Sequence, residues 1–285
     1  MNKILKRLIV FFISLPVLFS VVIFLPQKNH LLFNAIVVLF TVIAAVEFRS
    51  ILSNKNLEIS LPEAAILGAV GPAVWTLVVS FGFGEEIVHG AFILVASWLL
   101  VSQIFVPEKK LDSSVNRIAA GFAVMLYPGL LVSSLIRLSL FRNSGIIILF
   151  FLLIVFLNDS LAWTAGMLFG KNNRGLLAVS PNKSIAGFAG GQLFSVLTGI
   201  VAAVLFPEIF SPKILPPITA GALLGFGSGI AVILGDLCES AIKRSAGVKD
   251  SGFLVLGRGG ALDSIDSLAM AAPVYYYLFR LLFQL

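Results

Sequence analysis

The chain has 285 residues, of which 59% are hydrophobic and only 12% are charged, and its mean hydropathy is +1.04. Soluble domains carry about 25% charged residues, so this composition excludes an ordinary soluble protein and indicates one that crosses a membrane several times. The formal net charge is +6, but the cations lie between apolar runs, where they set topology and meet anionic headgroups. We therefore expect membrane lipids around the chain and no nucleic-acid partner.

Apolar runs long enough to span a bilayer, which takes about 20 helical residues, recur nine times. They predict an all-α, polytopic integral membrane protein that forms a single transmembrane domain over residues 1–285, with N-terminal helices in 1–142 and a catalytic half in 143–285. Tyr127-Pro128-Gly129 predicts a kink or break within the fifth run. The nine predicted spans are residues 4–25, 31–48, 62–83, 87–106, 116–140, 145–169, 187–206, 215–242 and 262–284.

The distribution of cations predicts the orientation of these spans. With nine spans, the side of the N-terminus collects all of the Lys and Arg residues except Lys28, Arg137, Arg142, Lys213 and Arg280. Loops rich in Lys and Arg stay in the cytoplasm. The loops 170–187 and 243–262 are therefore expected to face the cytoplasm.

A polar stripe is predicted at the end of the eighth run. Asp236, Glu239, Ser240, Lys243 and Arg244 follow the spacing i, i+3, i+4, i+7, i+8, which places them on one face of a helix. Mg²⁺ commonly takes one or two carboxylates and completes its shell with water and substrate phosphates. The alternative is a polar stripe that only fastens helices together.

The ninth run opens with two carboxylates behind a glycine-rich turn. Asp263 and Asp266 follow Gly257-Arg258-Gly259-Gly260, and Lys249-Asp250 precedes it. Backbone N–H groups in such a turn can approach an anion closely, and adjacent aspartates can hold a metal ion that bridges it. Simple capping of the helix N-terminus is the alternative.

Two polar segments lie upstream. Asn158-Asp159-Ser160 interrupts the sixth run, and an aspartate at that depth needs a partner or a water-filled cavity. The following loop carries Arg174 and then Ser180-Pro181-Asn182-Lys183-Ser184 just before a glycine-rich helix start. This arrangement predicts a phosphate-binding turn, with contact to lipid headgroups as the alternative.

These segments together resemble a known family. Ser240-x-x-Lys243-Arg244-x4-Lys249-Asp250-Ser251-Gly252, continuing to Gly259-Gly260-x-x-Asp263-x-x-Asp266, resembles the signature of phosphatidate cytidylyltransferases, also called CDP-diacylglycerol synthases. Asn158-Asp159-Ser160, Phe169-Gly170-Lys171 and the segment Ser180 to Ser184 look like a second conserved region of that family. The resemblance covers the C-terminal half by motif and the N-terminal half by topology.

The resemblance implies the reaction CTP + phosphatidate → CDP-diacylglycerol + diphosphate in phospholipid biosynthesis, in a bacterial inner membrane. Mg²⁺ is the implied cofactor, as one or two ions. A homodimer stays an open alternative for the oligomeric state. The implied catalytic residues are Asp236, Asp263, Asp266, Lys249 and Asp250, and the implied metal ligands are Asp236, Glu239, Asp263 and Asp266. The implied substrate contacts are Asn158, Asp159, Lys183, Ser184, Ser240, Lys243, Arg244, Arg258, Gly259 and Gly260.

This chain departs from the family pattern at four positions. Leu256 and Arg258 stand where Pro and His are usual, Ser264 replaces an Arg, and Ala186 replaces an acidic residue. We expect Arg258 to bind the phosphate that the family's usual Arg at position 264 would bind. Two alternatives stay open: a CTP-dependent lipid-alcohol kinase, and an ion-coupled transporter that uses Asp159, Asp236 and Glu239.

Overall fold

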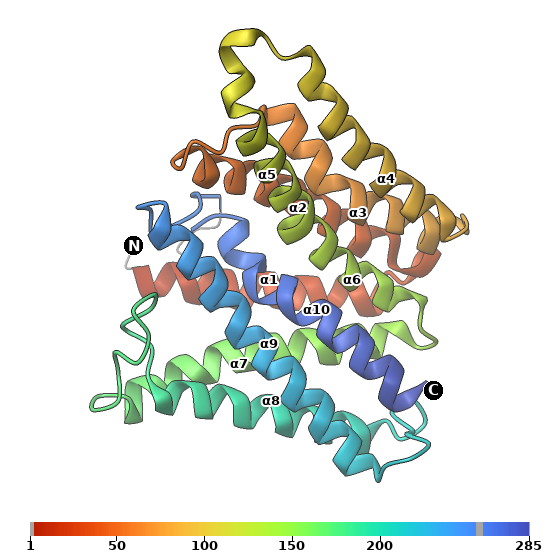
Figure 1. Ribbon diagram of the computed structural model, residues 1–285. Helices are drawn as coiled ribbons and strands as arrows, with labels where there is room; N and C mark the ends of the chain where they lie inside the picture. The colour runs from red at the N-terminus through yellow and green to blue at the C-terminus, as the bar shows by residue number, and fades with distance from the viewer. Residues whose placement is uncertain (1–2, 255–258, 285) are drawn as a thin grey trace. The chain divides into compact units, whose positions relative to one another are not determined.

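The computed structural model describes residues 3–254 and 259–284, and in these ranges the chain is helical without a β-strand. Figure 1 shows the helices in chain order, which confirms the predicted all-α fold. They are α1 (Lys3–Phe24), α2 (Gln27–Ser53), α3 (Leu61–Phe81), α4 (Glu86–Val101), η1 (Ser102–Phe105), η2 (Glu108–Ser113), α5 (Ser114–Val124), η3 (Met125–Leu131), α6 (Val132–Arg137), η4 (Leu138–Leu140), α7 (Ser144–Phe169), α8 (Ile185–Leu205), α9 (Pro217–Ser245) and α10 (Leu262–Phe283).

Seven helical segments among the described residues are long and apolar enough to cross a membrane. The protein is therefore an integral membrane protein. The predicted number of nine spans is not confirmed, because α1 and α10 lie in the first and ninth predicted runs but are not among the seven. The seven segments are Gln27–Ser53, Leu61–Phe81, Glu86–Phe105, Leu111–Leu140, Ser144–Phe169, Ile185–Leu205 and Pro217–Ser245.

The fifth predicted run contains the irregularity expected at its proline. After α5 the chain forms a π-helical segment, η3, with Pro128 inside it, and then resumes as α6. Proline lacks the N–H that an α-helix needs at this position, and a wider turn relieves the clash of its ring. A Cβ on Gly129 would lie 3.2 Å from the carbonyl oxygens of Leu67 and Gly68 in α3. The small residue therefore lets η3 pack directly on the α3 backbone.

The helices group into two compact units. Unit 1 comprises Met1–Leu140 and Ile242–Ile265, and unit 2 comprises Phe141–Ala241 and Asp266–Leu285. Within unit 1, α3 packs against α2, α4, α5, η3 and α6. Within unit 2, α7 runs beside α8 (Figure 1). The boundary between the units after Leu140 lies close to residue 142, where the sequence analysis divides the N-terminal helices from the catalytic half. Residues 242–265, however, group with the N-terminal helices. The single transmembrane domain stays a prediction.

The core of unit 2 is aromatic. The rings of Phe151 and Tyr275 lie 5.2 Å apart, and Phe210 meets Phe279 edge-on at 5.5 Å. The Tyr275 hydroxyl donates a hydrogen bond of 3.1 Å to the Ile147 carbonyl oxygen, so its one polar atom is satisfied. These contacts fix α10 against α7 within the unit.

Replacement of Gly199 by alanine is expected to destabilise unit 2. Gly199 in α8 lies so close to α9 that an added Cβ would overlap the Gly221 carbonyl oxygen and lie 2.9 Å from the Gly225 nitrogen. Backbone atoms cannot yield as a flexible side chain can, and overpacking of this kind costs about 1–3 kcal/mol. Thermal unfolding in detergent measures the loss. Gly90→Ala in α4 is the control, because its Cβ would meet nothing within 4 Å; equal stability of both variants would contradict this packing.

Candidate functional site

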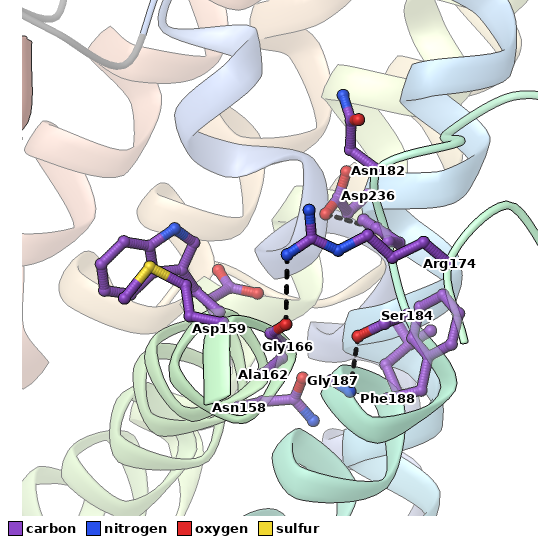
Figure 2. A pocket seen from close by; sticks show the side chains of 14 residues that line it. Asn158, Asp159, Ala162, Gly166, Arg174, Asn182, Ser184, Gly187, Phe188 and Asp236 are labelled. Carbon is purple, nitrogen blue, oxygen red and sulfur yellow. Dashed lines mark hydrogen bonds and ion pairs between the residues drawn. The ribbon is translucent and has the colours of Figure 1, made fainter. Parts of the chain in front are cut away.

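A cavity of about 410 Å³ opens in unit 2 between α7, the loop 170–184, the start of α8 and α9 (Figure 2). It joins residues from three predicted segments that are far apart in sequence. The polar lining comprises Asn158, Asp159, Arg174, Asn182, Lys183, Ser184 and Asp236, and the remaining lining comprises Ala162, Trp163, Gly166, Met167, Gly187, Phe188 and Ile233. Two cations and two carboxylates thus line one space in a largely apolar protein.

An ion pair crosses one wall of this cavity. The Lys183 ammonium from the loop binds the Asp236 carboxylate of α9, and the Ser240 hydroxyl donates to the other Asp236 oxygen at 3.4 Å. The Lys183 ammonium also lies 5.8 Å from the centre of the Phe188 ring. The side chains of Lys183 and Asp236 remain 27% and 36% exposed. Both groups are therefore oriented and can still reach a bound ligand.

The basic loop is fastened to the ends of α7 and α8. The Ser184 hydroxyl accepts a hydrogen bond of 3.0 Å from the Gly187 N–H and so caps α8. Arg174 reaches back to α7, where its guanidinium donates to the Gly166 carbonyl oxygen at 3.3 Å (Figure 2). The backbones of Arg174 and Ser184 pair in an isolated antiparallel bridge. The predicted phosphate-binding turn is therefore ordered, and the Ser184 hydroxyl is engaged by its own helix.

The neighbours Asn158 and Asp159 have different surroundings. Asn158 is 1% exposed, and its amide donates to the Ser195 hydroxyl at 2.8 Å and to the Gly229 carbonyl oxygen at 3.4 Å. These bonds join α7 to α8 and α9, so Asn158 fastens helices. Asp159 is only half-buried, and both residues line the cavity. Both residues belong to one sequence motif, and the motif does not reveal that they differ in burial and in hydrogen-bond partners.

A second cluster lies in unit 1, where α9 ends and α10 begins. The Lys243 ammonium binds one oxygen of Asp263, and these side chains are only 10% and 7% exposed. The other Asp263 oxygen accepts hydrogen bonds from the Gly260 N–H at 2.7 Å and from the N–H and hydroxyl of Ser251, each at 2.9 Å. Asp263 thus binds both Ser251 and Gly260 in the segment between α9 and α10.

Glu47 in α2 belongs to the same cluster, and the sequence analysis missed it. One carboxylate oxygen accepts the Ala261 N–H at 3.0 Å, and the other accepts the Leu262 N–H at 2.9 Å and the Ser251 hydroxyl at 3.0 Å. Glu47 precedes Ser251 by 204 positions, so no local motif joins them. The available signal was a single acidic residue inside an apolar run, which marks a functional or structural partner.

The other predicted residues differ in accessibility. Glu239 and Asp266 are buried, at 1% and 9% exposure. Arg244, Lys249 and Asp250 are exposed, and the Arg244 guanidinium donates to the Val248 carbonyl oxygen at 3.3 Å.

The glycine-rich turn is described only from Gly259 onward. Gly259 has a φ of +116°, which only glycine adopts without strain. Arg258 and Leu256 lie outside the described residues. The N–H groups of Gly260, Ala261 and Leu262 already donate to Asp263 and Glu47. Phosphate binding by Gly259 and Gly260 therefore stays a prediction.

The cavity in unit 2 has donors that suit Mg²⁺. Asp159 and Asp236 carry carboxylates, the hard oxygen donors that Mg²⁺ prefers, and its remaining positions would suit water and substrate phosphates. Among the residues that the structure describes, no group of three or more His, Cys, Asp or Glu side chains is arranged to hold a metal ion. A bound ion would thus depend on its substrate for ligands, and ligation by Glu239, Asp263 and Asp266 stays a prediction.

Sequence comparisons connect this arrangement with known proteins. The profile of the Cytidylyltransferase family matches residues 5–282. A phosphatidate cytidylyltransferase of Staphylococcus saprophyticus is 30% identical over 264 residues, which cover 92% of this chain and 95% of that protein. The uncharacterized protein YnbB of Escherichia coli is 37% identical over 140 residues, 49% of this chain and 44% of that protein. A phosphatidate cytidylyltransferase of Synechocystis is 40% identical over 121 residues, 42% of this chain and 39% of its own length.

Proposed function

This chain belongs to the cytidylyltransferase family, and from that premise we propose that it is a phosphatidate cytidylyltransferase, which converts CTP and phosphatidate to CDP-diacylglycerol and diphosphate. The observation that carries the proposal is the cavity of unit 2. There Arg174 and Lys183 share one space with Asp159 and Asp236, within a bundle whose buried residues are mostly apolar. Cations for phosphates and oxygen ligands for a divalent ion are what a nucleotide in a membrane protein requires.

The chemistry needs little from the protein besides positioning and charge. A phosphate oxygen of phosphatidate attacks the α-phosphorus of CTP, a new P–O bond forms, and the bond to the bridging α–β oxygen breaks. The leaving diphosphate takes the electron pair. Because the nucleophile is already an anion, no general base is required, and orientation with charge neutralisation supplies most of the rate.

The cavity residues supply these two functions. Lys183, held by Asp236, and Arg174, held at the end of α7, neutralise phosphate charge and fix the direction of CTP. Asp159 and Asp236 would hold Mg²⁺, which neutralises charge on the phosphates when bound. The sequence also predicts phosphate contacts by Lys243, Arg244, Lys249 and Arg258, and these stay predictions.

The apolar lining suits a lipid substrate. Trp163 and Met167 line the cavity from α7, and each is 55% exposed. Exposed apolar side chains beside a polar cavity allow the acyl chains to stay in the bilayer while the phosphate enters. The cation distribution supports an orientation with this loop in the cytoplasm, and the bacterial relatives support the inner membrane as its location.

Diphosphate release tests the proposal against its alternatives. Purified protein with CTP, phosphatidate and Mg²⁺ is expected to release diphosphate only when both substrates are present, and a chelator is expected to stop the release. Lys183→Met is expected to lower kcat by on the order of 10²-fold, because the phosphates lose a fixed cation. In a parallel assay with a lipid alcohol in place of phosphatidate, release of CDP without diphosphate would identify a lipid kinase. Release of neither product by folded protein in either assay would refute the proposed reaction and favour a transporter.

A further inference from the structure

We propose that Glu47, in α2, is a positioning residue for the transfer reaction, because it fixes Ser251 and the start of α10 and so the Asp263 carboxylate that binds Lys243. This inference rests on the proposed function. Glu47 contributes no atom to the cavity of unit 2. It acts through Ser251 and the first residues of α10, which it binds directly.

The first step of the argument is the capping of α10. The Ala261 and Leu262 N–H groups stand at the start of this helix, where no carbonyl of the same helix can accept them. Glu47 accepts both, at 3.0 and 2.9 Å, one on each carboxylate oxygen. A carboxylate is favoured there by the partial positive charge of the helix end. The beginning of α10 is therefore tied to α2.

The second step is the space that two glycines leave for this carboxylate. A Cβ on Gly252 would overlap a Glu47 carboxylate oxygen and lie 2.8 Å from its Cδ and 3.3 Å from its Cγ. A Cβ on Gly260 would overlap the other oxygen and the Ser251 hydroxyl. Both glycines belong to the signature segment. The absence of a side chain at these two positions therefore leaves room for the Glu47 carboxylate.

The third step connects Glu47 to Asp263. The Ser251 hydroxyl oxygen lies 3.0 Å from Glu47 and 2.9 Å from Asp263, and it accepts the Asp263 N–H at 3.3 Å. A hydroxyl has one proton, so the two carboxylates share one donor. Displacement of Glu47 would therefore shift Ser251, and with it the carboxylate that binds Lys243.

The test combines an isosteric variant with a double-mutant cycle. Glu47→Gln is expected to lower kcat by on the order of 10²-fold, the effect of a small misplacement, while KM for CTP and for phosphatidate stays within about threefold. Gly252→Ala is expected to act in the same way, since the three heavy atoms nearest its Cβ all belong to Glu47. In a Glu47→Ala background, Gly252→Ala should cost nothing further. Glu58→Gln, an exposed carboxylate of unit 1, should leave kcat unchanged.

Each outcome separates the two proposals. The positioning role is supported if wild type is active and both Glu47→Gln and Gly252→Ala have a low kcat. In the Glu47→Ala background, Gly252→Ala must then add no further loss. Active wild type with normal kcat in Glu47→Gln, or with independent losses that multiply in the cycle, overturns it. Inactive wild type overturns the proposed function itself. Hydrogen exchange at the Ala261 and Leu262 amides, slow in wild type and fast in Glu47→Ala, reports the cap without any activity.

Discussion

Asp236→Asn is expected to lower kcat for CDP-diacylglycerol formation by on the order of 10³-fold. The change keeps the shape of the side chain and removes its charge, so Lys183 loses the partner that orients it and the cavity loses one of its two carboxylates. The fold should persist, because an ion pair that is about one-third exposed contributes at most about 1 kcal/mol. Steady-state kinetics of purified protein, together with thermal unfolding in detergent, measure both effects.

Glu208→Gln is the matched control for this prediction. Glu208 is an exposed carboxylate of unit 2 that does not line the cavity, so its neutralisation should change neither kcat nor stability. If Asp236→Asn retained kcat within about threefold of wild type, its charge would play no part in the reaction. The cavity would then lose its assignment as the reaction site.

Lys243→Met is expected to destabilise the protein by about 3–5 kcal/mol, the usual cost of leaving a buried carboxylate without its cation. The partner, Asp263, has a side chain that is only 7% exposed, so water cannot replace the ammonium. The expected loss of stability is larger than for Asp236→Asn because the Lys243–Asp263 pair is buried, whereas the Lys183–Asp236 pair is about one-third exposed. Chemical unfolding in detergent measures the loss, and Lys55→Met, at an exposed lysine of unit 1, is the control.

A second substitution separates charge from packing in this cluster. Asp263→Asn in the Lys243→Met background is expected to recover part of the lost stability, because the amide oxygen still accepts the N–H groups of Gly260 and Ser251 without a buried charge. Activity should remain low in the double variant. A double variant less stable than Lys243→Met would show that the buried charge is not the cause.

The sequence predicted the parts of the fold that depend on local pattern. Apolar runs of bilayer length became helices, and Pro128 produced the irregular segment within the fifth run because proline cannot continue an α-helix. The i, i+4 spacing of Asp236 and Ser240 gave the expected contact. The number of spans was not confirmed, since α1 and α10 are not among the segments that meet the length and apolarity criteria.

The candidate site could be predicted only where its residues form local motifs. Asp236, Lys183 and Asp159 were all identified, and the structure brings them to one cavity. Glu47 was missed because its partners are about 200 positions away and only packing brings them together. Asn158 also lines the cavity, so its substrate contact stays a prediction, but its motif does not reveal that its amide bonds to α8 and α9.

The fate of the α-phosphate of CTP tests the central claim most directly. Purified protein in detergent is given phosphatidate, Mg²⁺ and CTP labelled at the α-phosphate, and label in the lipid phase is followed over time. Wild type is expected to move the label into CDP-diacylglycerol, and Lys183→Met is expected to do so on the order of 10²-fold more slowly. Folded wild-type protein that binds CTP but leaves all α-label in the aqueous phase would contradict cytidylyl transfer by this chain.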